Sequence, residues 1–299
     1  MPSSLRIRAF ALLAFANLLW SGNWVVGRGL RHAFDPIELN FWRWLIAALV
    51  LAPFAWPLVA ARREAIRRNA GVLALLALTG VAFFQSLLYL GLESTTAINA
   101  VLINASGPLF MLLCSWVVER EKATGRQIAG LLVSLAGVLV IVSQGEIARL
   151  LQLEFHAGDS WILLAMPIFG LYSVLLKRRP PELDGTALIF TISVFGVALL
   201  APVFAIDALL SPPRWPAPAE AAGVLYVALA ASVGAFLSWN RGVALVGANA
   251  AGFTLPLLPV FGTVLAMIFL DESFHAFHAL GFATILAGVV LATRPAGNS

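Results

Sequence analysis

The stretch Gly91–Leu139, GLESTTAINAVLINASGPLFMLLCSWVVEREKATGRQIAGLLVSLAGVL, occurs twice in this chain. Shifted by 151 positions, it falls on Gly242–Val290, GVALVGANAAGFTLPLLPVFGTVLAMIFLDESFHAFHALGFATILAGVV. A chain of 299 residues that contains two such copies is internally duplicated. The copies share a residue type at these paired positions: Gly91/Gly242, Ala97/Ala248, Pro108/Pro259, Phe110/Phe261, Glu121/Glu272, Gly130/Gly281, Ala136/Ala287, Gly137/Gly288 and Val138/Val289.

The composition indicates that lipid, and not water, surrounds most of the protein. Hydrophobic residues make up 61% of the chain and charged residues 11%, whereas soluble domains average roughly 45–50% and roughly 25%. The apolar runs are each about 20 residues long, which is the length that a helix needs to cross a hydrocarbon core of about 30 Å. The sequence therefore predicts an all-α integral membrane protein, with the lipid bilayer as its main partner.

Ten membrane spans can be placed, five in each half of the chain. We divide the chain into a first five-helix repeat, residues 1–145, and a second, residues 146–299. Because five is an odd number, the second copy must enter the membrane from the opposite side, so we expect an inverted repeat around a central cavity. The predicted spans lie near residues 9–30, 37–60, 70–91, 98–118, 127–144, 158–176, 185–206, 219–241, 248–270 and 275–293.

Lys and Arg residues predict the orientation. Placing both termini on the cytoplasmic side puts fourteen of the nineteen Lys and Arg residues in cytoplasmic segments and four outside, with Arg43 inside a span. We therefore predict a multi-pass protein of the bacterial inner membrane with cytoplasmic termini. The sequence pI of about 9.8 is explained by these basic loops, which also meet anionic lipid, and no nucleic-acid partner is needed.

Polar and aromatic side chains within the spans mark a candidate substrate site. Polar groups inside a bilayer must be satisfied by other helices or by water, so their positions trace a cavity. They recur in corresponding spans of both halves, which packing alone does not require, although any one of them could serve only as packing or as an interfacial Trp. The predicted substrate-binding residues are Asn17, Trp20, Asn23, Trp24, Gln85, Tyr89, Asn104, Trp161, Tyr172, Trp239 and Thr254.

Prolines interrupt the fourth and ninth spans, which correspond in the two repeats. Pro108 lies in the fourth span, and Pro256 and Pro259 lie in the ninth. Each proline removes a backbone donor, and we expect each to kink its helix and to leave a carbonyl free for a substrate. Paired interrupted helices point to a transport site between the repeats, with these prolines in a gating role, although a kink can also serve packing alone.

Ionisable groups are almost absent from the predicted spans. Arg43 is the only firmly embedded charge, and we interpret it as a structural residue that either reaches the membrane surface or pairs with Glu38. No Asp, Glu or His lies mid-span, so we expect no proton relay, no metal site and no cofactor. A membrane-embedded serine protease with Ser106 as nucleophile would need a deep His as its base, and the sequence offers none.

The Leu19–Asn23 stretch, the Ala97–Pro108 segment, the hinge Glu119–Glu121 and the Gly-rich fifth span together resemble the EamA-domain transporters of the drug/metabolite transporter superfamily. The resemblance covers nearly the whole chain, twice, and within that superfamily the sequence is most similar to the aromatic amino acid exporters. It implies ten helices around a central cavity, export of metabolites such as amino acids, and a packing or dimer face on spans five and ten.

The substrate expected from the candidate residues is an aromatic or large neutral amino acid, carried out of the cytoplasm by alternating access. Amide and hydroxyl groups can bind its charged ends, and Trp and Tyr rings can hold its side chain. Another small metabolite or drug is the alternative, and the protein would act as a monomer or a homodimer. The seven-residue spacing from Gly130 to Gly137, and from Gly281 to Gly288, suits close helix contact or dimerisation.

Overall fold

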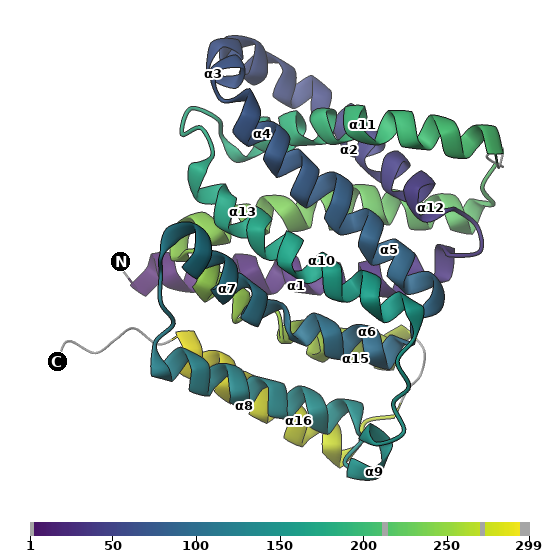
Figure 1. Cartoon of the computed structure of the whole chain (residues 1–299), viewed down its shortest axis with the longest axis vertical. Helices are drawn as coiled ribbons and strands as arrows, with labels where there is room; N and C mark the ends of the chain where they lie inside the picture. Colours follow the sequence, from purple (N-terminus) through teal and green to yellow (C-terminus); the bar gives the residue numbers. More distant parts are fainter. Residues whose placement is uncertain (1–2, 211–214, 270–272, 294–299) are drawn as a thin grey trace.

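The computed structural model describes residues 3–210, 215–269 and 273–293, and every regular element in these ranges is a helix (Figure 1). Ten helical stretches are long and apolar enough to cross a membrane, and each overlaps a predicted span. Two short helices, α3 (Arg63–Arg68) and α9 (Ile147–Leu150), connect spans. Asp271 and Glu272, which follow the ninth predicted span, and the basic residues Arg214 and Arg294 lie outside the described residues.

Five spans are continuous α-helices, and the others consist of several helical pieces. The first half contains α1 (Ser3–Leu30), α2 (Pro36–Ala61), α4 (Ala70–Ala77) with η1 (Leu78–Phe83) and α5 (Phe84–Ser94), α6 (Ala97–Ala105) with α7 (Gly107–Glu119), and α8 (Gly125–Val142). The second half contains α10 (Ala157–Leu175) with η2 (Leu176–Arg178), α11 (Gly185–Leu210), α12 (Pro218–Tyr226) with η3 (Val227–Gly234) and α13 (Ala235–Val246), α14 (Ala248–Gly252) with α15 (Leu257–Phe269), and α16 (Ala276–Thr293). The continuous spans are α1, α2, α8, α11 and α16.

Local sequence signals explain where several helices begin and end. Thr124 and Gln127 form a reciprocal capping box at the start of α8, with Thr124 N donating to Gln127 Oε1 at 2.8 Å. Pro36 occupies the first turn of α2, where its missing N–H costs nothing. Gly247 separates the eighth and ninth spans with φ +84°, a conformation that favours glycine.

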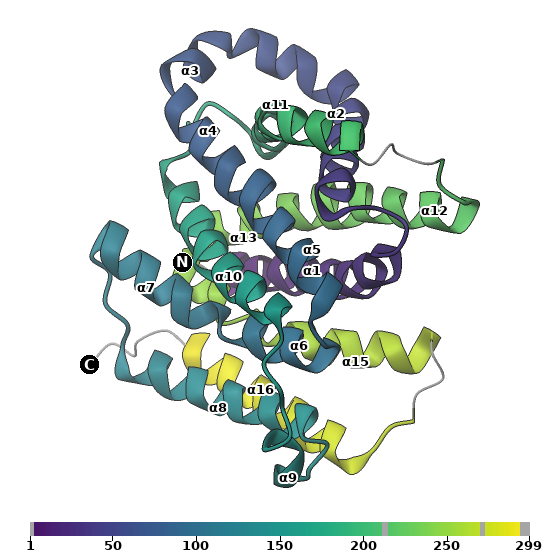
Figure 2. The ribbon, with the colours of Figure 1, turned by 45° about the vertical axis from the view of Figure 1, so that its right-hand side comes forward.

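Equivalent helices of the two halves pack along each other. In Figures 1 and 2, α8 and α16 lie side by side, apart from the bundle that contains α2 and α11. Their contact is antiparallel, because a Cβ at Gly130 would lie 2.6 Å from the Gly288 carbonyl oxygen and one at Gly137 would lie 2.8 Å from that of Gly281. The four glycines thus allow close contact between two helices of one chain, which confirms the first of the two uses predicted from their seven-residue spacing.

The connections between helices lie at two ends of the molecule. We call the end that contains the described start of α1, the end of α16 and the α2–α3–α4 connection the terminal face, on the left in Figure 1. The opposite end, with the C-terminal end of α1 and the α8–α9–α10 connection, is the distal face. The guanidinium of Arg6 donates to the Thr293 carbonyl, which joins the two ends of the described chain at the terminal face.

The third and eighth spans each contain a π-helical segment at the corresponding place, η1 and η3. The fourth and ninth spans are broken instead, at Ser106 between α6 and α7 and at residues 253–256 between α14 and α15. Pro108 sits in the first turn of α7, and Pro256 and Pro259 flank the start of α15, so the predicted interruptions are present at the prolines. Such irregular segments inside a membrane helix are tolerated where they face protein or a cavity.

Candidate functional site

A cavity of about 410 Å³ lies at the distal face, between α1, α6, α15 and the ends of α8 and α16. The basic residues Arg28 and His278 are among its lining residues. No described lining residue is an Asp or a Glu. Its walls are otherwise largely apolar, with Trp24, Asn104 and Leu258 at the inner end. The cavity therefore offers an apolar, positively biased path from the distal face into the membrane.

A small chamber of about 20 Å³ continues the cavity inward. Trp24, Asn104 and Leu258 line both spaces, so these three side chains form the boundary between them. The chamber brings together pieces of both halves of the chain. Its other lining residues are Trp20, Asn23, Phe84, Gln85, Leu88, Phe169 and Leu255.

The polar face of α1 contacts the break in the ninth span. Asn17 donates to the Thr254 hydroxyl at 3.1 Å, and Ser21 donates to the Leu258 carbonyl at 3.0 Å. The carbonyls that Pro256 and Pro259 would have paired, four residues earlier, accept bonds from the Leu255 and Leu258 N–H groups at 3.0 and 2.9 Å. The expectation of free carbonyls is therefore wrong at these two prolines, because the turn tightens and satisfies them itself.

An aromatic cluster closes the chamber toward the terminal face. The Trp20 ring lies 5.4 Å from Phe169, 5.5 Å from Phe236 and 5.2 Å from Trp239, measured between ring centroids. Its indole N–H donates to the Ala231 carbonyl of η3 at 3.1 Å. Trp20 thus has both its ring and its polar group engaged by the second half of the chain.

Ion pairs lie beyond this cluster, around a pocket of about 260 Å³ at the terminal face. Lys177, at the end of the sixth span, contacts Glu121 at 3.0 Å and Glu119 at 3.3 Å. Arg178 contacts Glu119 at 3.2 Å, and Asn249 at the start of α14 donates to Glu121 at 3.4 Å. These contacts tie the ends of the fourth, sixth and ninth spans together, so the terminal side is closed while the distal side is open.

Arg43 lies at the centre of a buried polar network and has no exposed surface. Its Nε donates to Ser232 Oγ in η3 at 2.7 Å, and its Nη1 donates to Gln85 Oε1 at 2.9 Å and to the Tyr89 hydroxyl at 2.5 Å. Tyr89 in turn donates to Asn23 Oδ1 at 2.9 Å. The side chain neither reaches the membrane surface nor forms an ion pair with a described carboxylate, so both predicted roles for Arg43 are wrong.

Arg43 is the site residue that the sequence interpretation missed. A lone Arg within a span is by default a functional candidate, and that signal was available. Its contact with Ser232 could not be predicted, because the π-helical turn of η3 brings that hydroxyl to Arg43 from 189 positions away along the chain. The corresponding π-helical segment of the third span, η1, also contacts α2, because the side-chain amide of Asn40 donates to the Val81 carbonyl at 3.0 Å.

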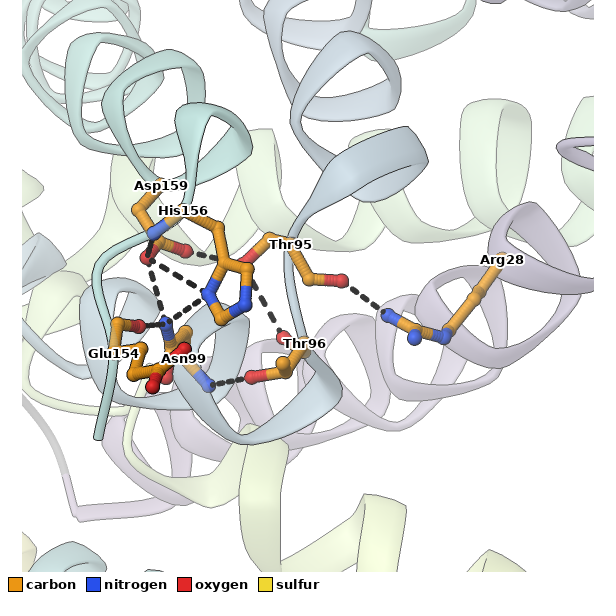
Figure 3. A network of polar contacts seen from close by, with 7 residues as sticks. All are labelled: Arg28, Thr95, Thr96, Asn99, Glu154, His156 and Asp159. Atoms are coloured by element: carbon orange, nitrogen blue, oxygen red, sulfur yellow. Dashed lines mark hydrogen bonds and ion pairs between the residues drawn. The ribbon is translucent and has the colours of Figure 1, made fainter. Parts of the chain in front are cut away.

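A second buried charge, Asp159, organises the distal end of the fourth and sixth spans (Figure 3). Its carboxylate accepts bonds from Asn99 Nδ2 at 2.6 Å, from the His156 backbone N–H at 2.8 Å and from the Thr95 hydroxyl. We call this hydrogen-bonded contact between the fourth and sixth spans the Asp159 joint. Arg28 of α1 donates to the Thr95 carbonyl at 2.8 Å, which links the joint to the mouth of the cavity. Asp159 lies in the first turn of α10 and not mid-span, as the sequence indicated, but the fold buries it.

The predicted site residues fall into three groups. Trp20, Asn23, Trp24, Gln85 and Asn104 line the chamber. The structure places Asn17, Tyr89, Tyr172, Trp239 and Thr254 directly behind the chamber residues, all buried. Trp161 stands apart, because 43% of its surface is exposed on the outer side of α10, away from the chamber.

The profile of the EamA-like transporter family matches residues 7–143 and again residues 156–294. The chain belongs to the EamA-like transporter family. The two matches cover both halves of the chain. This family member is therefore a membrane transporter and not a membrane-embedded enzyme.

Individual relatives agree with this assignment. An uncharacterized transporter of Archaeoglobus fulgidus is 30% identical, over 94% of this chain and 96% of its own. A protein of Streptantibioticus cattleyicolor named "Probable terminal-alkyne amino-acid exporter" is 29% identical, over 96% of this chain and 94% of its own. A crystal structure with 23% identity superposes with a TM-score of 0.71 over 98% of this chain and 97% of that one, which shows a shared fold.

Proposed function

We propose that this EamA-like transporter exports amino acids with aromatic or large apolar side chains from the cytoplasm. One observation carries the proposal: the chamber combines ring faces with amide side chains at the inner end of an otherwise apolar cavity. Indole rings suit an apolar side chain and amides suit the charged ends of an amino acid. The similarity to a protein named as an amino-acid exporter supports the same substrate class.

Transport proceeds by alternating access between the two faces. The proposed inverted repeat is supported by the antiparallel contact of α8 with α16, since these helices are equivalent in the two halves. Closing the distal cavity onto the chamber while the Lys177, Glu119 and Glu121 contacts separate would expose the chamber to the terminal face. The broken fourth and ninth spans supply the segments that move.

The terminal face is proposed to be cytoplasmic, in the inner membrane, because most Lys and Arg residues lie in the segments assigned to that face. Cysteines placed at Arg67 and Arg178 should resist an impermeant thiol reagent in intact cells, while one at Gln152 should react. The chain's own Cys114 is replaced first. Labelling at Arg178 without labelling at Gln152 would reverse the orientation.

The substrate is tested by loading purified protein into proteoliposomes and measuring counterflow of labelled phenylalanine. Replacing Trp20 with Ala removes one ring contact and its buried area, so phenylalanine counterflow should fall by about tenfold or more, and threonine counterflow should fall less. Trp161→Ala is the matched control, because that ring faces outward, and it should transport like the wild type. No phenylalanine counterflow by the wild type would favour the alternative, another small metabolite or drug.

A further inference from the structure

Arg43 is a fully buried cation that the protein leaves incompletely satisfied. Its partners Ser232, Gln85, Tyr89 and Asn23 are all neutral, and the ion pairs of the described chain do not include it. Its Nη2 atom is buried and has no hydrogen-bond partner. Isolated charges inside a membrane protein are costly and are functional candidates by default, so the uncompensated charge of Arg43 is a candidate to act on a substrate through the groups around it.

The guanidinium also fixes the orientation of two amides that line the chamber. Gln85 Oε1 and Asn23 Oδ1 both face Arg43 Nη1, at 2.9 and 3.4 Å. A guanidinium can only donate, so each amide must present its oxygen to Arg43 and its NH₂ group to the other side. Asn23 and Gln85 line the chamber. The side-chain hydrogen bonds of these two residues within the described chain all use the amide oxygen, which leaves both NH₂ groups available as donors.

The Asn23 and Gln85 NH₂ groups are therefore a pair of donors, polarised by Arg43, at the inner end of the distal cavity. Hydrogen bonds in a chain strengthen one another, and a low dielectric enlarges the effect of the charge behind them. No Asp or Glu occurs among the described residues that line the chamber or the distal cavity, whereas Arg28 does line the cavity. This arrangement attracts an anion and has no comparable group for a cation.

We propose that the Asn23 and Gln85 NH₂ groups, backed by Arg43, bind the carboxylate of the substrate. The substrate class is then a monocarboxylate with an apolar tail. An ammonium group meets ring faces such as those of Trp20 and Trp24 and the Asn104 amide, but no carboxylate among the described lining residues, so it is tolerated and not required. 2-Hydroxy and 2-oxo acids with the same side chains therefore bind as well as the amino acids do. This inference rests on the proposed function for the location of the site. It adds that the negatively charged carboxylate is the group that a substrate must have.

Binding to the purified wild type tests the inference without any need for transport. Calorimetric titration with 3-phenyllactate, which lacks the amine, is compared with phenethylamine, which lacks the carboxylate. We expect phenyllactate to bind at least about tenfold more tightly. Equal binding of the two compounds, or no binding of phenyllactate, would overturn the inference.

The matched variant is Gln85→Glu, which places a carboxylate beside Arg43 Nη1 and removes the NH₂ donor in one isosteric change. It should keep or raise the thermal stability, because the buried cation gains a partner, and should weaken phenyllactate binding by about tenfold or more. Gln127→Glu makes the same chemical change in the capping box of α8, far from the chamber, and should leave binding unchanged. Unchanged phenyllactate binding in Gln85→Glu would contradict the proposal.

Arg43→Gln provides an independent variant, which should lose the preference for phenyllactate over phenethylamine. A protein that merely needs Arg43 for folding would lose stability and keep the preference. The two proposals also fail separately. If phenyllactate binds and depends on Arg43 while labelled phenylalanine shows no counterflow, amino-acid export is wrong and carboxylate recognition stands.

Discussion

Two buried charges, Arg43 in the first half of the chain and Asp159 in the second, are held in opposite ways. The carboxylate of Asp159 receives three hydrogen bonds from its own joint, from Asn99, Thr95 and the His156 backbone. The guanidinium of Arg43 has neutral partners and leaves Nη2 unpaired. A buried charge that is fully satisfied by its neighbours stabilises the fold, whereas one left incompletely paired adds little stability, and in the proposal above Arg43 acts on a ligand through the amides that it polarises.

Neither charge is repeated in the other half. At the offset of 149 that relates the first two spans to the sixth and seventh, Arg43 falls on Ile192 and Asp159 falls on Phe10. Each charge is present in one copy of the duplicated framework only. The duplication therefore builds two similar halves, and these two buried charges distinguish one half from the other.

The largest expected effect is on stability, from Asp159→Ala. Removing the carboxylate leaves the Asn99 amide, the Thr95 hydroxyl and the His156 N–H without their acceptor, so the free energy of unfolding in detergent should fall by about 3 kcal/mol. Asp159→Asn keeps one acceptor oxygen and should cost about half as much. Wild-type stability in Asp159→Ala would mean that this joint does not stabilise the fold.

Arg43→Met should show the opposite pattern. Met removes the cost of burying a charge but leaves Gln85 Oε1 without the Arg43 donor, so these two effects offset each other and the free energy of unfolding should stay within about 1 kcal/mol of the wild type. Binding of phenyllactate should nevertheless weaken by about tenfold or more, which corresponds to about 1.4 kcal/mol. Chemical unfolding and calorimetric titration on the same preparation measure both quantities. A large loss of stability would show that Arg43 stabilises the fold as Asp159 does.

The smallest effect is expected from Thr95→Val, which removes one donor to Asp159 at nearly constant shape. The free energy of unfolding should fall by about 1 kcal/mol, since a single hydrogen bond is lost. Ligand binding should stay at the wild-type level, because Thr95 does not line the chamber. A drop in phenyllactate affinity comparable to that in Arg43→Met would show that the two clusters are coupled and would end the distinction drawn between them.

The sequence by itself determined the elements of this fold and many of the residues near the site. Run length and polarity locate the ten spans because the bilayer imposes a nearly constant helix length. The breaks in the fourth and ninth spans lie at the prolines that predicted them, although proline alone does not specify a break, since α2 continues through Pro53 and Pro57. Helical spacing likewise put Trp20 and Trp24 on one face of α1, and both line the chamber.

Only the tertiary structure decided which polar groups are satisfied and by which partners. Trp161 and Trp20 look alike as aromatic residues inside spans, yet one faces outward and the other is packed against Phe169, Phe236 and Trp239. The physical reason is that hydropathy records the exchange of a side chain between water and lipid, while hydrogen bonding inside the membrane depends on which distant helix lies opposite. Arg43 donates to the hydroxyl of Ser232, which lies 189 residues away along the chain, and no local pattern specifies that contact.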